Sequence, residues 1–170
     1  MVTDTDGPDA NRLREVFGAF PTGVVAVCAV RGGRPVGMAA SSFTSVSLDP
    51  PLVSVCIQRT SQTWPVLRES PRLGVTILAA RQGVACRTLS MKQGDRFAGV
   101  DWYAHEDGSV VVRDASAWLV TSVHAELDAG DHLVSLLRVH TVDADPHSPP
   151  LVFHRSGFHR LTSVADEVSS

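Results

Sequence analysis

The feature that most constrains the fold is the stretch at residues 37–58, GMAASSFTSVSLDPPLVSVCIQ. Small residues are followed by a run of Ser and Thr, by Pro50-Pro51, and by an apolar β-rich run. This pattern predicts an extended segment, a hydroxyl-rich loop and a strand. Small side chains let a ligand approach the backbone, and hydroxyls beside free amides can hold a phosphate or a ring carbonyl. We therefore expect a bound anion or cofactor here; a plain polar loop between two strands is the alternative.

The rest of the chain alternates short apolar runs with turn residues. Strands are predicted at residues 24–30, 36–42, 52–58, 73–78, 109–112, 118–127 and 132–142, and a closing hairpin at 151–154 and 158–161 turns about Ser156-Gly157. A short helix is predicted after Asp9, with Leu13, Val16, Phe17 and Phe20 on one apolar face. Two more helices are predicted near 61–69 and over 81–90, the latter with a costly interior Gly83. Pro21-Thr22-Gly23 ends the first helix, and residues 91–105 form a long loop. These elements predict a mainly β barrel with short helices attached.

Length and composition indicate one globular domain. The chain has 170 residues, of which 44% are hydrophobic and 19% charged. We expect a disordered tail at 1–8, a single domain at 9–161 and a loose tail at 162–170. The net charge of −3 gives no strong attraction to nucleic acid or to an anionic membrane.

Neither membrane insertion nor a disulfide framework is indicated. No stretch is long and apolar enough to span a bilayer, and the N-terminus is acidic and polar, unlike a signal peptide. We therefore expect a soluble, cytoplasmic protein. Cys28, Cys56 and Cys86 are odd in number and form no C-x-x-C pair, so buried reduced thiols are expected. The histidines are scattered, and no metal site is predicted.

Known catalytic signatures are absent from the sequence. It contains no G-x-S-x-G elbow, no Walker phosphate loop, no G-x-G-x-x-G fingerprint and no H-E-x-x-H helix. Any nicotinamide coenzyme must therefore bind outside a Rossmann domain.

One resemblance accounts for the ordered set of motifs. SSFTSVSLDPPLVSVCI, at residues 41–57, resembles the core motif of the flavin reductase-like family. Further similar segments follow the family's order: FGAFPTGVVAVCA (17–29), RLGVTILA with Gln82, RFAGVDW (96–102), GDH (130–132) and PLVFHRSGFHRL (150–161). Together they cover nearly all of residues 12–161. The resemblance implies an FMN-binding split β-barrel with Greek-key-like connections.

The same resemblance implies site residues. Met38, Ala39, Ala40, Ser41 and Ser42 would line the flavin ring and ribityl chain, with Ser41 and Ser47 as phosphate or ribityl contacts. Val55, Cys56 and Ile57 would flank the ring edge, Ser61 and Thr63 would lie near the phosphate, and Arg96 and Phe97 near the flavin tail. His132 would act catalytically on the nicotinamide side, enclosed by His154 and Phe158.

Several of these residues have a plain alternative role. Ser41 and Ser47 could satisfy loop amides, and Arg96 could be a solvated surface charge. Phe97 could pack its loop down, and His132 could be a hydrogen-bonded residue at a strand start. Many relatives read T-A-N-S where this chain has Met38-Ala39-Ala40-Ser41, which removes potential hydrogen bonds to the flavin and leaves FAD or FMN open.

The function implied is an NAD(P)H-dependent flavin reductase. It would pass a hydride from NADH or NADPH to FAD or FMN and supply reduced flavin to a separate monooxygenase, as a homodimer. Such chemistry fits the sparse catalytic signatures, because flavin and nicotinamide carry the reactivity. The alternatives are a flavin-binding carrier without turnover and a split-barrel flavin oxidase acting on an organic substrate. Arg31, Arg34 or Arg155 could receive the 2′-phosphate of NADPH, but the sequence does not choose between the coenzymes.

Overall fold

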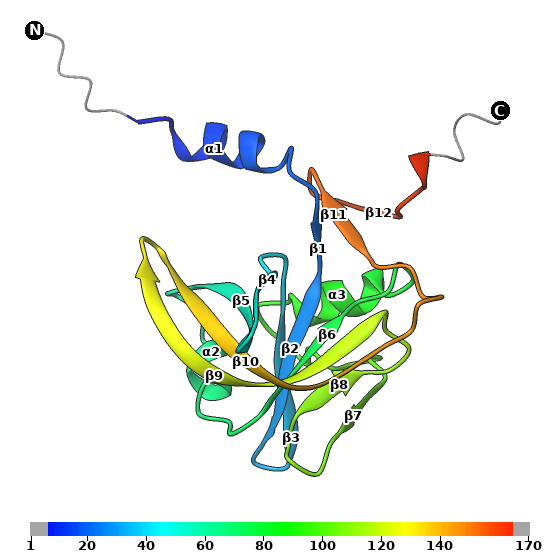
Figure 1. The fold of residues 1–170 in the computed structure, drawn as a ribbon. Coiled ribbons are helices and arrows are strands. Elements are labelled where there is room, and N and C mark those ends of the chain that lie inside the picture. Colours follow the sequence, from blue (N-terminus) through cyan, green and yellow to red (C-terminus); the bar gives the residue numbers. More distant parts are fainter. Residues whose placement is uncertain (1–6, 165–170) are drawn as a thin grey trace, which may run out of the picture.

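A curled seven-stranded antiparallel sheet with the order β3-β2-β6-β9-β10-β5-β4 forms the body of the molecule (Figure 1). This computed structural model describes residues 7–164. The strands are β2 (Val25–Arg31), β3 (Arg34–Ala40), β4 (Thr44–Leu48), β5 (Pro51–Gln58), β6 (Leu73–Ile77), β9 (Ala117–Ala129) and β10 (His132–Ala144). Just after β3, the Ser42 hydroxyl accepts a hydrogen bond from the Cys56 N–H at 2.9 Å and donates one to the Cys56 carbonyl at 3.1 Å. The sheet thereby bends back on itself, and the predicted mainly β architecture is confirmed.

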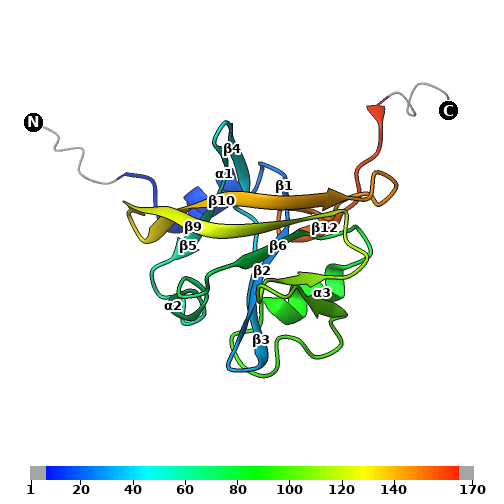
Figure 2. The ribbon, with the colours of Figure 1, turned by 60° about the horizontal axis from the view of Figure 1, so that its bottom comes forward.

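Two small sheets and three short helices complete the described structure. β1 (Thr22–Gly23), β11 (Val152–His154) and β12 (Gly157–His159) form one sheet, and β7 (Trp102–Ala104) pairs with β8 (Val110–Val112). The helices are α1 (Ala10–Phe17), α2 (Trp64–Leu67) and α3 (Gly83–Leu89). Figure 2 shows α2 and α3 on the same side of the long β9–β10 hairpin, toward its two ends. No helix in the described part of the chain is long and apolar enough to cross a bilayer.

Strand β2 is buried on both faces. Val25 and Val27 belong to a cluster that includes Trp64 of α2, whereas Ala26 and Cys28 belong to a second cluster that includes Leu89 of α3. Because successive strand residues point to opposite faces, an uninterrupted apolar run is what such a strand requires. The two clusters fix α2 and α3 against opposite faces of the same strand.

Three segments expected as loops or helix stops are short strands. Thr22–Gly23 pairs with β11, Thr44–Leu48 with β5, and Trp102–Ala104 with β8. Each lies beside a neighbouring strand that offers backbone hydrogen bonds, and this tertiary pairing overrides local composition. The hydroxyl-rich loop of the prediction is therefore confined to the residues between β3 and β4.

The predictions for α3 and the closing hairpin need correction. Gly83 is the first residue of α3, not an interior one. A Cβ there would lie 3.3 Å from the Phe158 ring, so the missing side chain allows β12 to pack closely on the helix. The hairpin turns one residue earlier than expected, at Arg155 and Ser156 with φ of 47° and 63°, because Gly157 already belongs to β12.

Helix α1 forms as expected but is not packed. The Asp9 carboxylate accepts from the N–H groups of Asn11 and Arg12, as an N-cap does. No residue of α1 is buried, and the helix ends before Phe20. Figure 1 shows it standing apart from the main sheet. Of the expected tails, residues 1–6 and 165–170 lie outside the described residues.

Candidate active site

A cleft of about 560 Å³ opens where the end of β3 passes β5, a size typical of ligand sites. We call it the basic cleft. Its lining residues come from β3 and the residues after it, from β5, from the loop before α2, and from the end of α3 and the loop beyond. They are Met38, Ala39, Ala40, Ser41, Ser42, Cys56, Gln58, Thr60, Ser61, Gln62, Thr63, Leu89, Ser90, Lys92 and Arg96.

The charges of the basic cleft are of one sign. Lys92 and Arg96 line it, and no carboxylate does, although the whole chain carries a net charge of −3. The Arg96 guanidinium donates from Nη1 to the Thr63 hydroxyl at 2.8 Å and to the Gly37 carbonyl at 3.3 Å. These bonds hold Arg96 at the cleft, which does not fit the alternative of a solvated surface charge. Two cations without a carboxylate suit an anionic ligand such as a phosphate.

The hydroxyls of the cleft divide into structural and available groups. The Ser42 hydroxyl is engaged by Cys56, as described above, and the Ser61 hydroxyl accepts from the Trp64 N–H at 3.1 Å at the start of α2. The Ser90 hydroxyl donates to the Cys86 carbonyl at 2.7 Å. Ser41, by contrast, is exposed and its hydroxyl has no partner among residues 7–164. Among the serines that line the basic cleft, Ser41 therefore has a hydroxyl free for a ligand.

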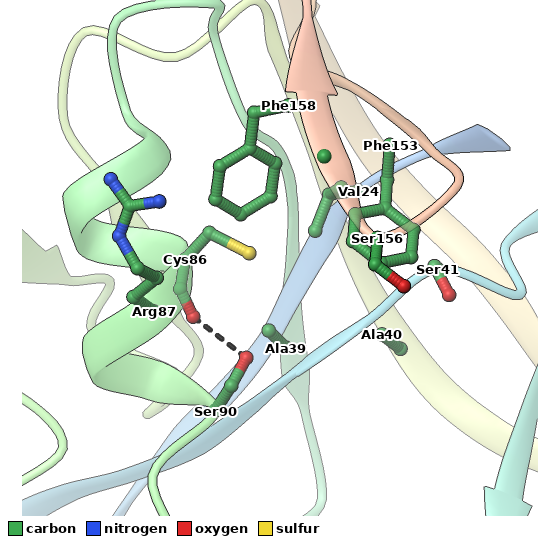
Figure 3. Close-up of a pocket in the computed structure, with 11 residues that line it drawn as sticks. Val24, Ala39, Ala40, Ser41, Cys86, Arg87, Ser90, Phe153, Ser156 and Phe158 are labelled. Carbon is green, nitrogen blue, oxygen red and sulfur yellow. Dashed lines mark hydrogen bonds between the residues drawn. The ribbon is translucent and has the colours of Figure 1, made fainter. Parts of the chain in front are cut away.

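A second hollow, of about 490 Å³, adjoins the first (Figure 3). We call it the aromatic pocket. It is lined by Val24, Ala39, Ala40, Ser41, Cys86, Arg87, Ser90, Phe153, Ser156, Gly157 and Phe158. The Phe153 and Phe158 rings lie 5.9 Å apart, and the Arg87 guanidinium stacks 5.0 Å from the centre of the Phe158 ring.

The two hollows share Ala39, Ala40, Ser41 and Ser90. The shared wall is thus formed by the end of β3 with Ser41 after it, and by Ser90 at the C-cap of α3, all of which have small side chains. A planar ring can approach the backbone of such a strand closely, and a second ring can reach it from the adjoining hollow. This junction is a suitable place for two planar ligands to meet.

The three cysteines are free thiols in different surroundings. Cys56 faces the basic cleft and Cys86 the aromatic pocket. Burial raises the pKa of Cys86, and complete burial raises the pKa of Cys28 to about 12. Within the described residues, no group of three or more His, Cys, Asp or Glu side chains could hold a metal ion.

The structure gathers many of the predicted site residues and leaves others elsewhere. Met38 to Ser42, Cys56, Ser61, Thr63 and Arg96 line the basic cleft, and Phe158 lines the aromatic pocket. Six residues line neither hollow: Ser47, Val55, Ile57, Phe97, His132 and His154.

Each residue outside the hollows has a clear structural place. Val55 and Ile57 are buried in the core because they alternate with Cys56 along β5, so their side chains point away from the cleft. Phe97 packs edge-on against Trp102 at 6.1 Å, as its alternative role required. Ser47 pairs with Leu52, and His154 Nε2 lies 3.2 Å from the Ala19 carbonyl.

His132 is the first residue of β10 and lies beside the basic cleft. It is paired with Gln58, which does line the cleft. Its Nδ1 lies 2.7 Å from the Asp131 carboxylate. Hydrogen bonding to His132, together with the charge of its ring, lowers the pKa of Asp131, so that carboxylate stays ionised in neutral solution. The second ring nitrogen of His132 remains available.

Several lining residues were not predicted. They include Gln58, Thr60, Gln62, Ser90 and Lys92 in the basic cleft, and Arg87 and Phe153 in the aromatic pocket. Two signals were present in the sequence. Cys86 and Ser90 are four residues apart and share a face of the predicted helix, and Lys92 is the single lysine of the chain.

Comparison with known proteins identifies the family. The family model described as flavin reductase like domain matches residues 17–162. The chain belongs to the flavin reductase-like family. The fold matches that of a solved protein, a Streptomyces globisporus NADH:FAD oxidoreductase in complex with NAD and FAD fragments. That protein is 38% identical to this chain, and the two structures superpose with a TM-score of 0.87 over 95% of this chain and 98% of that one.

Two further relatives contain a similar domain and differ in how much of their length this chain covers. A probable flavin reductase of Rhizobium meliloti is 40% identical over 132 residues, which is 77% of this chain but 42% of the relative's length. The reductase subunit of a flavin-dependent monooxygenase from Rhodococcus jostii is 35% identical over 150 residues, or 88% of this chain and 77% of that protein. The flavin reductase-like domain thus occurs in chains of different length.

Proposed function

We propose that this flavin reductase-like protein is an NAD(P)H-dependent flavin reductase that transfers a hydride from NADH or NADPH to FAD or FMN. The observation that carries the proposal is the junction of the two hollows at Ala39, Ala40 and Ser41. Hydride transfer requires two planar rings to stack, and this wall is open from both sides. The names of the relatives, among them a flavin reductase of Pseudomonas putida and an NADH:FAD oxidoreductase, support the same activity.

The basic cleft is proposed to hold the flavin. Lys92 and Arg96 would neutralise its phosphate, and Ser41 would donate to its ribityl or phosphate oxygens. Ser42 and Ser61 act indirectly: the first fixes the end of β3 to β5, and the second fixes the start of α2. When bound, the flavin supplies a ring that accepts the hydride, so the chain needs no strong general base.

The remaining predicted roles are part of the proposal. His132, held by Asp131 next to Gln58, lies beside the basic cleft, and we propose that it acts on the nicotinamide ring from the flavin side of the junction. His154 and Phe158 would enclose the nicotinamide on the other side through the β11–β12 hairpin. The single-domain organisation over residues 9–161 is supported by a family match that spans 17–162.

We also propose a homodimer that supplies reduced flavin to a partner monooxygenase. The exposed apolar residues of the N-terminal region support a dimer: Val16, Phe17 and Phe20 are 53%, 68% and 74% exposed. An eight-residue helix is marginal in water without tertiary packing, so a second subunit would stabilise it. The Rhodococcus jostii relative, named as a monooxygenase reductase subunit, supports the partner. Three free thiols fit a reducing compartment, which supports the proposed cytoplasmic location.

Steady-state oxidation of NADH and NADPH by the purified protein, with excess FAD, FMN or riboflavin, tests the proposal. A reductase gives saturable turnover that depends on both added flavin and coenzyme. A carrier instead retains flavin during purification and gives no turnover with either coenzyme. An oxidase requires an organic substrate before oxygen is consumed, and that result would also contradict the proposal.

A further inference from the structure

Arg87 is the cation of the aromatic pocket, and it is held in place without a counter-ion. Its guanidinium stacks 5.0 Å from the centre of the Phe158 ring, beside Gly83 one helical turn earlier. No hydrogen-bond acceptor or carboxylate partner of Arg87 occurs within residues 7–164. Figure 3 shows the guanidinium at the edge of the pocket, on the far side of the Phe158 ring from Phe153. Its N–H donors are therefore positioned but unused.

The chemistry of the two hollows differs. The basic cleft has Lys92 and Arg96 among hydroxyl and amide side chains, whereas the aromatic pocket has two Phe rings and Arg87. If a flavin nucleotide occupies the basic cleft, a second ring can reach the shared wall only from the aromatic pocket. A ligand that fits the aromatic pocket then has a planar apolar end at the shared wall and an anionic end at Arg87.

The geometry points to Arg87 as a residue that binds the diphosphate of the nicotinamide coenzyme. This inference rests on the proposed function, and it assigns coenzyme affinity to Arg87 and flavin affinity to Lys92 and Arg96. A planar guanidinium donates two parallel hydrogen bonds to a phosphate, and its stacking on Phe158 orders the side chain before the ligand arrives. Arg87 thus discriminates between hydride donors that carry phosphate and donors that lack it.

The decisive comparison uses two hydride donors with wild-type protein and the Arg87→Gln variant. NADH carries the diphosphate, whereas 1-benzyl-1,4-dihydronicotinamide carries the same reactive ring without any phosphate. We expect Arg87→Gln to raise KM for NADH roughly tenfold and to leave the rate with the benzyl donor and the KM for FAD unchanged. Arg87→Lys restores part of the NADH affinity because it keeps the charge.

Direct binding gives a readout that does not depend on turnover. Saturation-transfer NMR with NAD⁺ should show roughly tenfold weaker binding to Arg87→Gln than to wild type. The matched control is Arg113→Gln, because Arg113 also stacks on an aromatic ring, 4.7 Å from the centre of Tyr103, but lines neither hollow. That control should bind NAD⁺ as wild type does.

Two results would overturn the inference. Equal losses with both donors would mean that Arg87 acts only by holding Phe158, and unchanged NAD⁺ binding would mean that it does not contact the coenzyme. Failure of the proposed function looks different. In that case wild-type protein binds NAD⁺ through Arg87 but reduces no flavin with either donor.

Discussion

Gly74 shows how closely two backbones approach in this fold. A Cβ at Gly74 of β6 would lie 1.9 Å from the Val110 carbonyl oxygen of β8, a distance that no side-chain rotation can relieve. We predict that Gly74→Ala lowers the free energy of unfolding by about 3 kcal/mol, because one of the two strands must move. Chemical denaturation measures the loss. Gly23→Ala is the control, since a Cβ there meets nothing within 4 Å, and an equal loss in both variants would contradict the argument.

The cysteines should differ in reactivity with alkylating reagents. Thiolate is the reactive form, so a raised pKa slows alkylation. Cys28 is fully buried with a pKa of about 12, and burial also raises the pKa of Cys86, so both should stay unmodified in native protein at pH 8. Cys56 lines the basic cleft and should react first.

Mass spectrometry after iodoacetamide treatment identifies the modified thiol. Added FAD should slow alkylation of Cys56, because the proposed flavin covers the cleft wall on which this residue lies. Reaction of Cys56 at the same rate with and without saturating FAD would place the flavin elsewhere. Unfolding in denaturant should expose all three thiols.

Arg96 should contribute to flavin affinity. It lines the basic cleft and donates to the Thr63 hydroxyl at 2.8 Å. A charge-assisted contact to phosphate contributes about 1.5–3 kcal/mol, so Arg96→Gln should weaken FAD binding at least about tenfold. Flavin fluorescence titration measures the change. Arg138→Gln, at an exposed position of β10, is the control, and a similar loss there would indicate a general charge effect.

At the residue level, the sequence predicted which residues line the basic cleft better than it predicted what their side chains do there. Ser42 was expected to line the flavin site, and it does line the cleft, but its hydroxyl is engaged in two hydrogen bonds with Cys56. Val55 and Ile57 shared the motif of Cys56 yet point into the core. A motif specifies which segment forms the site, whereas strand alternation and local hydrogen bonds decide which side chains reach it.

Among the elements of the described structure, α1 is one that leaves its apolar side chains unburied. Asp9 at the N-cap and the spacing of Leu13, Val16 and Phe17 predicted the helix correctly, but periodicity cannot tell whether its apolar face meets its own domain or another subunit. Here no residue of α1 is buried. The proposed second subunit would supply the partner that this face lacks among the described residues of its own chain.

The double variant Phe17→Ser with Phe20→Ser should therefore shift the protein from dimer to monomer, because it removes apolar surface that the second subunit is proposed to cover. Size-exclusion chromatography with light scattering measures the mass. Val142→Ser, in which a residue 62% exposed on β10 is replaced, serves as the control and should stay dimeric. A double variant that remains a dimer would show that α1 takes no part in the interface.

The missed strands have a common cause. Thr44–Leu48 is rich in hydroxyl side chains, and Trp102–Ala104 lies in a Gly- and Asp-rich segment. Local composition therefore favours a loop in both places. Each nevertheless pairs with the strand that follows it in the chain: β4 with β5, and β7 with β8. Such pairing depends on where the neighbouring strand lies, which composition does not encode.

For the molecule as a whole, the apolar runs and the order of motifs predicted the mainly β fold and the segment that forms the basic cleft. They did not predict the aromatic pocket, because Val24, Cys86 and the hairpin that carries Phe153 and Phe158 are far apart in the chain and meet only after folding. The sequence also could not reveal that the cleft excludes carboxylates, since that property belongs to the surface and not to the composition.

The measurement that tests the central claim most directly is anaerobic mixing of protein and oxidised FAD or FMN with NADH or NADPH. The loss of flavin absorbance is followed in time and compared with a mixture without protein. If the two hollows bring flavin and nicotinamide together, the protein accelerates this loss by orders of magnitude and the rate saturates with coenzyme. Flavin that is bound by the protein but reduced no faster than in its absence, with every pair of flavin and coenzyme, would contradict the account.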